Sequence, residues 1–232
     1  MNGRLVLFDI DGTLVDTGGA GMAALKLAGR DVFGAEGPEL DLAGATDSAI
    51  VRGLLEHFGK PVNDENIRRF YRAYLAYLED HLGDEAFDGR VLPGVMDLLE
   101  EFRLAGAVLG LLTGNIAEGA VRKMRHYGMD DYFAFGAFGD DHHDRNRLGP
   151  VALARAGEAT GREYCAGETL VIGDTPKDIA CGRAMGAITV CVGTGAFTAP
   201  QLRSHGADLV FEEFSGLTAI AEGVYAIRRS ED

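Results

Sequence analysis

Two carboxylates stand two residues apart, directly after a short apolar segment near the start of the chain. The segment at residues 4–8 (RLVLF) is followed by Asp9, Ile10, Asp11, Gly12 and Thr13. Ionised carboxylates this close repel each other unless a cation is bound or one of them is protonated. Hard oxygen ligands favour Mg²⁺, which in proteins takes few carboxylates, several waters and a substrate phosphate oxygen. The pair therefore predicts either a Mg²⁺ site beside a phosphate or an ordinary turn or helix cap.

Two further polar segments also follow apolar runs, so they bear on this choice. Thr113, Gly114 and Asn115 offer a hydroxyl, backbone N–H groups and an amide to a phosphoryl group, and Asp174 and Asp178 add carboxylates. Open α/β sheets bind ligands at the carboxyl ends of their strands. Each segment alone is compatible with ordinary loop chemistry. Their joint placement after three predicted strands favours a single site.

The elements that position these residues are short apolar strands separated by amphipathic helices. Continuous apolar runs, rather than strict alternation, indicate strands buried on both faces of a parallel sheet. Predicted strands lie at residues 4–8, 107–112, 133–138, 169–172 and 188–192, with a further candidate at 208–211. Predicted helices lie at residues 95–105, 117–127, 150–160 and 176–185. This alternation is typical of an open, doubly wound α/β domain.

The stretch between the first strand and the others has a different pattern. Residues 16–87 contain helical patterns, at 47–57 and 65–81, and no convincing strand. We expect a helical insertion packed over the carboxyl end of the first strand, with residues 1–15 and 88–232 forming the core. Its hinges are predicted at Gly18, Gly19 and Gly21 on one side and at residues 87–93 on the other.

Composition limits the classes of partner and compartment. The 232 residues carry a formal charge of −14, with no basic stripe to displace counterions, which argues against a nucleic-acid partner. Three cysteines without a CxxC pair suit a reducing cytosol. The longest apolar stretch, at residues 104–112, is about half of what a bilayer span needs, and no targeting segment is visible. We expect a cytoplasmic protein that acts away from membranes.

Four motifs in order resemble those of the haloacid dehalogenase superfamily. They are Asp9-x-Asp11-Gly-Thr13, Thr113, a basic residue before a helix, and Gly173-Asp174-x-x-x-Asp178. The helical insertion directly after the first motif is similar to the C1 cap of phosphoglycolate phosphatase-like members. The resemblance covers essentially the whole chain. It implies a Rossmann-like, doubly wound parallel sheet with an inserted helical C1 cap.

The resemblance also implies roles for the first two motifs. Asp9 would be the nucleophile that forms an aspartyl-phosphate. Asp11 would protonate the leaving oxygen and then activate water, which splits one displacement into two easier steps. Thr113 would bind the transferring phosphoryl group, helped by backbone amides near Gly114 and Asn115.

The metal implied by the resemblance is Mg²⁺, whose charge would bring the anionic nucleophile and the phosphate together. Its ligands would be the Asp9 side chain, the Asp11 backbone carbonyl and Asp174. Asp178 would be a further ligand or would support the others.

The third motif departs from the superfamily's commonest pattern, a Lys-Pro pair. This chain has Asp-Arg-Asn-Arg-Leu-Gly-Pro at residues 144–150. An arginine can supply the same charge through a forked donor. We predict that Arg145 takes this role, because the length of the preceding strand and loop then matches, with Arg147 as the alternative. Either residue is also compatible with a solvated loop charge.

The segment before the predicted helix at residues 47–57 resembles the substrate-facing cap loop of phosphoglycolate phosphatase-like proteins. It makes Thr46 and Asp47 candidates for substrate binding. The plainer alternative is that one of them starts the helix as its N-cap. The two interpretations are compatible.

The function expected from these features is Mg²⁺-dependent hydrolysis of a small phosphorylated metabolite, with 2-phosphoglycolate as one candidate. A phosphotransferase resembling β-phosphoglucomutase uses the same aspartyl-phosphate, and the motifs do not separate the two. A non-catalytic ligand-binding protein of the same fold is a third alternative. A dehalogenase is disfavoured by Asp11, because that chemistry needs no acid for the leaving group.

Overall fold

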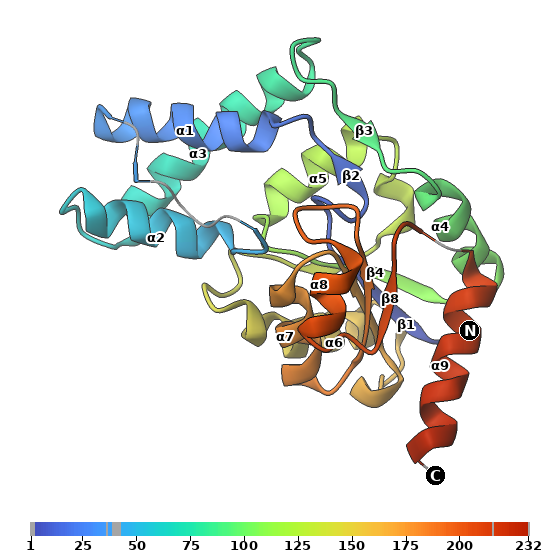
Figure 1. Ribbon diagram of the computed structural model, residues 1–232. Helices are drawn as coiled ribbons and strands as arrows, with labels where there is room; N and C mark the ends of the chain where they lie inside the picture. The colour runs from blue at the N-terminus through green and yellow to red at the C-terminus, as the bar shows by residue number, and fades with distance from the viewer. Residues whose placement is uncertain (1–2, 36, 39–42, 215, 232) are drawn as a thin grey trace.

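The core of the protein is a six-stranded parallel sheet in the order β5-β4-β1-β6-β7-β8. A computed structural model describes residues 3–35, 37–38, 43–214 and 216–231 (Figure 1). The strands are β1 (Leu5–Phe8), β4 (Val108–Leu112), β5 (Gly136–Ala137), β6 (Leu170–Gly173), β7 (Ile188–Val192) and β8 (Leu209–Phe211). The parallel, doubly wound α/β core predicted from the sequence is confirmed.

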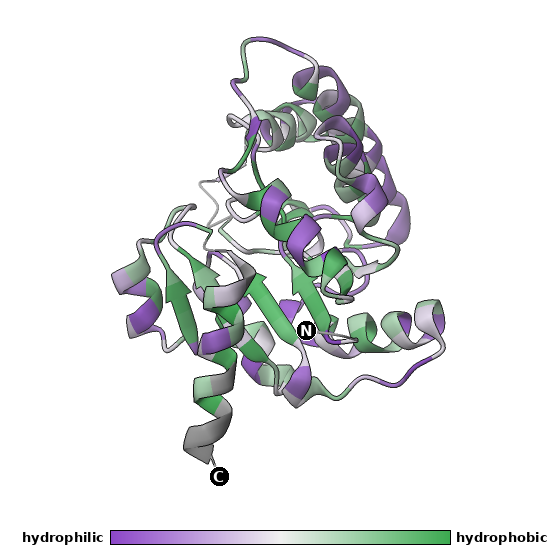
Figure 2. Cartoon of the chain, turned by 90° about the vertical axis from the view of Figure 1, so that its right-hand side faces the viewer, coloured by the Kyte–Doolittle hydropathy of each residue, from purple (hydrophilic) through white to green (hydrophobic). Residues whose placement is uncertain are grey.

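Both faces of the sheet are buried, as the continuous apolar runs predicted. Successive side chains of a strand point to opposite faces. In β1, Val6 and Phe8 pack into one core cluster, whereas Leu5 and Leu7 pack into another. Figure 2 shows these strands as almost uniformly hydrophobic in the interior of the molecule. Such strands belong to a sheet covered by helices on both sides.

The helices divide between the two faces. Residues of α4, α5 and α9 join the first cluster, and residues of α6 and α7 join the second, while α8 packs on a small cluster at the β7–β8 end. Their bounds are α4 (Val95–Leu104), α5 (Ala117–His126), α6 (Leu148–Thr160), α7 (Pro176–Met185), α8 (Ala199–Ser204) and α9 (Leu217–Glu231). Short 3₁₀ turns lie at η1 (Asp130–Tyr132), η2 (Arg145–Arg147) and η3 (Ala166–Glu168). Among the described residues, no helix is both long and apolar enough to cross a membrane.

One predicted strand is mostly absent. Of residues 133–138, only Gly136 and Ala137 form a strand, at the sheet edge beside β4. The aromatic residues of this segment are explained by side-chain packing. Phe133 and Phe138 pack against one core cluster, and Phe135 packs against another. Side-chain packing at the sheet edge was thus mistaken for a strand signal.

Three helices form a separate group beyond the sheet: α1 (Ala20–Phe33), α2 (Asp47–His57) and α3 (Asp64–Leu82). Figure 1 shows these helices grouped to one side of the sheet. They share their own hydrophobic cluster, which also includes Ile116, the N-cap of α5. The predicted helices at residues 47–57 and 65–81 correspond to α2 and α3. The division into a core and a cap at residues 16–87 stays a prediction.

The two connections to this helical group pair with each other, which the sequence did not predict. Strand β2 (Val15–Asp16) runs antiparallel to β3 (Arg90–Val91). Strands of two residues carry no periodicity that a sequence pattern could reveal. Gly21, predicted as part of a hinge, lies inside α1 instead.

Candidate active site

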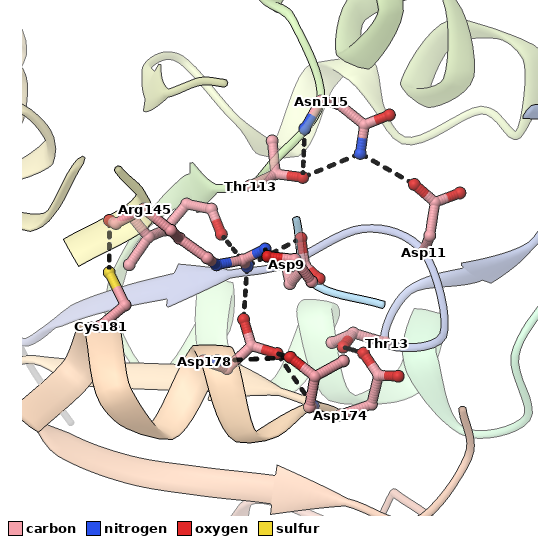
Figure 3. Close-up of polar contacts among 12 residues, drawn as sticks. Asp9, Asp11, Thr13, Thr113, Asn115, Arg145, Asp174, Asp178 and Cys181 are labelled. Atoms are coloured by element: carbon pink, nitrogen blue, oxygen red, sulfur yellow. Dashed lines mark hydrogen bonds and ion pairs between the residues drawn. The ribbon is translucent and has the colours of Figure 1, made fainter. Parts of the chain in front are cut away.

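Three polar side chains converge at the carboxyl end of the sheet. Asp9 follows β1, Thr113 follows β4 and Asp174 follows β6. β1 lies between the other two strands, and each of the three residues is at most 4% exposed. Figure 3 shows them facing a common centre with Arg145 and Asp178. The structure therefore brings together the segments that the sequence predicted would meet.

The carboxylates of Asp9, Asp174 and Asp178 form the buried cluster at this centre. One oxygen from each lies within 4.8 Å of the others. Burial raises the pKa of Asp9 to about 6, although the Arg145 guanidinium opposes the shift. Burial and the neighbouring acids Asp178 and Asp9 also raise the pKa of Asp174 well above its usual range. Three oxygen donors with such unfavourable charge fit a hard divalent cation such as Mg²⁺.

Arg145 is the cation inside this cluster. Its Nη2 lies 3.3 Å from Asp9 Oδ1 and also bonds Asp178, and its side chain is 6% exposed. Its Nε is buried without a hydrogen-bond partner among the described residues. Arg147, the alternative weighed from the sequence, is exposed. Both lie on the η2 turn, and the structure brings only Arg145 to Asp9.

Local structure fixes Asp178. Thr175 is the N-cap of α7, and its backbone N–H and hydroxyl donate to Asp178 Oδ2 at 2.9 and 2.7 Å. The Asp178 N–H in turn bonds the Thr175 hydroxyl, which completes a capping box, and Pro176 occupies the first helical position. One carboxylate oxygen of Asp178 thus caps its own helix, while the other faces Arg145.

Asp11 faces a second charged group, which sequence reasoning missed. Lys123 Nζ donates to both Asp11 oxygens, at 2.7 and 2.6 Å, and to Asn115 Oδ1 at 2.7 Å. The Asn115 amide donates to Asp11 Oδ2 at 2.8 Å and to the Thr113 hydroxyl at 2.9 Å. The Asp11 side chain is therefore held by Lys123 and Asn115, outside the cluster of three carboxylates.

A sequence signal for Lys123 did exist. On α5 it shares the buried face with Ala120 and Met124, where an amphipathic helix is expected to carry an apolar residue. A lysine on such a face is almost never fully buried unless it is paired. Its partner, Asp11, lies 112 residues away in the sequence, so the spacing alone did not reveal the pair.

Two glycines allow the backbone to pass close to its neighbours at the site. Gly12 has φ +78°, and a Cβ there would lie 2.3 Å from Asp174 Oδ2. A Cβ on Gly114 would lie 2.0 Å from the carbonyl oxygen of Ala45. A side chain at either position would displace the carboxylate or the loop that it faces.

The loop before α2 binds the core at several points. The Thr46 hydroxyl accepts from the Ala49 N–H at 3.1 Å, as an N-cap does, and donates to the His143 carbonyl at 2.7 Å. The Gly44 carbonyl accepts from Arg145 Nη1 at 3.0 Å. The predicted helix-starting role of Thr46 is thus observed, and the same residue ties α2 to the core.

Asp47, the first residue of α2, is buried. Its backbone N–H donates to the Gly114 carbonyl at 2.7 Å, and its Oδ2 accepts from the Ile116 N–H at 2.9 Å. Burial raises the pKa of Asp47 to about 7, against the lowering effects of that N–H and of Lys123. Asp47 therefore caps α5 of the core from a helix on the other side of the site.

A cavity of about 460 Å³ lies between these two sides. Its core side carries all the predicted catalytic residues except Thr113, together with Lys123. Its other side is formed by residues of α1, the loop before α2, α2 and α3. Of the substrate-binding candidates, the lining includes Gly114, Asn115 and Asp47 but not Thr46.

The chain matches a known family over most of its length. Residues 4–186 fit the family of haloacid dehalogenase-like hydrolases. The chain belongs to this family and is a hydrolase, as the four motifs indicated.

Individual relatives narrow the comparison. The chain is 28% identical over 233 residues to a probable phosphatase IndB of Dickeya dadantii, covering 97% of this chain and 96% of that protein. It is 26% identical to a phosphoglycolate phosphatase of Chromobacterium violaceum, with 92% and 94% covered. A β-phosphoglucomutase structure from Clostridium difficile superimposes with a TM-score of 0.75 at 18% identity, covering 97% of this chain and 98% of the other, and shows the shared fold.

Proposed function

We propose that this protein is a Mg²⁺-dependent phosphatase that hydrolyses a small phosphate monoester through an aspartyl-phosphate on Asp9. The observation that carries the proposal is the buried Asp9 carboxylate, 3.3 Å from Arg145 and clustered with Asp174 and Asp178 at the strand ends. Membership of the hydrolase family and the phosphatases among the relatives support the same chemistry.

The cation would be held by the side chains of Asp9, Asp174 and Asp178 and by the backbone carbonyl of Asp11. When bound, Mg²⁺ offsets negative charge on the carboxylate and the phosphoryl oxygens. Arg145 would add positive charge beside Asp9, and its Nε, which has no partner among the described residues, would be a candidate donor to a phosphoryl oxygen. The Thr113 hydroxyl and the backbone amides near Gly114 and Asn115 would orient the phosphoryl group.

In the first step, an oxygen of Asp9 attacks phosphorus and the bond to the leaving oxygen breaks. Protonated Asp11 supplies the proton that makes the leaving group a neutral alcohol. In the second step, Asp11 takes a proton from water as the water oxygen attacks phosphorus, which releases phosphate and regenerates Asp9. Lys123 and Asn115 hold the Asp11 carboxylate next to Asp9 for both transfers.

The helical group at residues 16–87 would act as a mobile cap. Gly44, Thr46 and Asp47 form hydrogen bonds with core groups across the site, which supports a closed position of the proposed cap. Closure would exclude bulk water and select the leaving group, and opening would release the products.

A panel of phosphorylated metabolites tests the proposal through Mg²⁺-dependent phosphate release, with 2-phosphoglycolate included because relatives are named for it. Asp9→Asn is expected to abolish turnover while the variant stays folded. Near-normal turnover by folded, Mg²⁺-loaded Asp9→Asn contradicts the proposal. Formation of an isomer from a sugar phosphate, without phosphate release, would favour a phosphotransferase instead.

A further inference from the structure

One wall of the cavity is formed by residues of α1, α2, α3 and the segments next to them. Among the described residues, this wall carries no cation. Its larger side chains are the apolar or aromatic Met22, Leu25, Ile50 and Tyr74 and the acids Asp16 and Asp47, and small residues make up most of the rest. Residues 36 and 39–42 lie outside the described part of the chain, but their sequence (Glu; Glu-Leu-Asp-Leu) holds no lysine or arginine. We call this surface the cap wall.

The two cations of the cavity belong to the core and already face acids. Arg145 pairs with Asp9 and Asp178. Lys123 directs its ammonium group at both oxygens of Asp11 and at the Asn115 carbonyl, which engages its three donors. Among the described residues that line the cavity, no cation is therefore left over for a second anionic group on a substrate.

Charge and shape together describe the leaving group that fits. An anionic leaving group would lose its hydration beside Asp47 without a cation to pair with it. Repulsion between this group and the Asp47 carboxylate would further weaken its binding. The apolar side chains of Met22, Leu25 and Ile50 instead offer favourable burial to an uncharged body.

We propose that the substrate is the phosphate ester of an uncharged alcohol, and that esters whose leaving group carries a carboxylate are rejected. This inference rests on the proposed phosphatase function and concerns the leaving group only. It separates this chain from the specificity named for its phosphoglycolate phosphatase relatives, because glycolate carries a carboxylate.

A matched pair of substrates provides the test. 2-Phosphoglycolate and 2-hydroxyethyl phosphate are nearly the same size, but only the first has a carboxylate in its leaving group. With the full-length chain and saturating Mg²⁺ at pH 8, we expect kcat/KM to favour 2-hydroxyethyl phosphate by about tenfold or more. Equal values, or a preference for 2-phosphoglycolate, overturn the inference.

A positive charge added to the cap wall should weaken the preference for the uncharged leaving group. Met22 lines the cavity and is 42% exposed, so Met22→Arg places a cation there without burying it. This variant should raise kcat/KM for 2-phosphoglycolate by about tenfold relative to 2-hydroxyethyl phosphate. Ala76→Arg adds the same charge at an exposed position of α3 outside the cavity and should leave the ratio unchanged.

The outcomes separate this inference from the function on which it rests. One outcome is that the protein hydrolyses both esters in a reaction that Asp9→Asn abolishes, with kcat/KM for 2-hydroxyethyl phosphate no higher than for 2-phosphoglycolate. That result supports the phosphatase and overturns the preference for an uncharged leaving group. No hydrolysis of any phosphate ester overturns the phosphatase itself, and the inference with it. An equal response of the ratio to Met22→Arg and Ala76→Arg also contradicts the inference, because a local charge on the cap wall would then have no specific effect.

Discussion

The two walls of the cavity differ in how their charges are paired. We call the wall at the carboxyl ends of the strands the core wall, opposite the cap wall. On the core wall, acids and cations are interleaved: Arg145 lies between Asp9 and Asp178, and Lys123 lies against Asp11. The cap wall combines apolar side chains with Asp47, whose carboxylate accepts a hydrogen bond from the backbone N–H of Ile116. One wall holds several compensated charges, and the other holds a single buried acid without a cation bonded to it.

The difference separates chemistry from selection. Attack, proton transfer and charge stabilisation need ionised groups in a fixed geometry, so the core wall builds them at strand ends and pairs them. In the proposed mechanism the cap wall contributes no group to these steps. Its shape and its acids would select the leaving group.

Removing the central cation should damage the core wall most. Arg145→Leu leaves Asp9 and Asp178 buried without their partner, so the free energy of unfolding should fall by about 3–5 kcal/mol. Urea denaturation without Mg²⁺ measures it. Arg147→Leu removes an exposed arginine from the same turn and should change stability by less than about 0.5 kcal/mol. Equal effects of the two variants would mean that the core charges do not compensate one another.

The buried acid of the cap wall should make stability depend on pH. The pKa of Asp47 is about 7 in the folded protein and 3.8 for an ordinary aspartate, so between these values the folded state binds more protons. Stability contributed by this group is therefore present at low pH and lost as the pH rises from about 4 to 7. Asp47→Asn removes that loss and can still accept from the Ile116 N–H.

Relative to the wild type, Asp47→Asn should be more stable at pH 8, by up to about 4 kcal/mol, and the gain should vanish near pH 4. Urea denaturation across this range measures the difference. Asp64→Asn, at an exposed acid that pairs only with Arg68 on the surface, should show no such trend. A gain for Asp47→Asn that is the same at all pH values would contradict the buried, proton-binding carboxylate.

Lys123 tests whether the second charge pair of the core wall serves Asp11. Lys123→Met removes all three of its hydrogen bonds, so Asp11 loses its orientation and kcat should fall roughly 100-fold. KM should change much less, because Lys123 acts through Asp11. Steady-state kinetics with the best substrate of the panel give both values. Lys26→Met, at an exposed position of α1, is the control, and a rise in KM with constant kcat would instead assign Lys123 to substrate binding.

The smallest effect is expected from a partner of the proposed metal site. The buried Thr13 hydroxyl donates to Asp174 Oδ1 at 2.9 Å, so Thr13→Val frees that carboxylate to turn. Mg²⁺ affinity should fall roughly tenfold, as measured by isothermal titration calorimetry. Thr160→Val removes a hydroxyl that bonds Ala156 within α6, away from the site, and should leave the affinity unchanged. Identical affinities in both variants would show that Asp174 needs no such support.

The sequence alone determined the sheet and the segments that meet at its edge. Short apolar runs predicted five of the six strands to within a residue or so, and the residues after β1, β4 and β6 were predicted to converge. These predictions succeed because a buried strand and its end can be recognised from a short apolar run and the polar residues after it. Parallel neighbours in a sheet also have their carboxyl ends at the same edge. The strand predicted at residues 133–138 exists but spans only Gly136–Ala137, because packing of aromatic side chains at the sheet edge extends the apolar pattern beyond it.

Contacts between residues far apart in the sequence could be identified from the tertiary structure alone. It brought Arg145 rather than Arg147 to Asp9, paired Lys123 with Asp11, and joined β2 to β3. It also gathered apolar residues and Asp47 into a wall without a described cation, which composition alone does not show. Such contacts depend on the rotation of a helix or turn about its axis and on closure across long sequence distances. Packing of the whole chain sets both, and no local pattern encodes them.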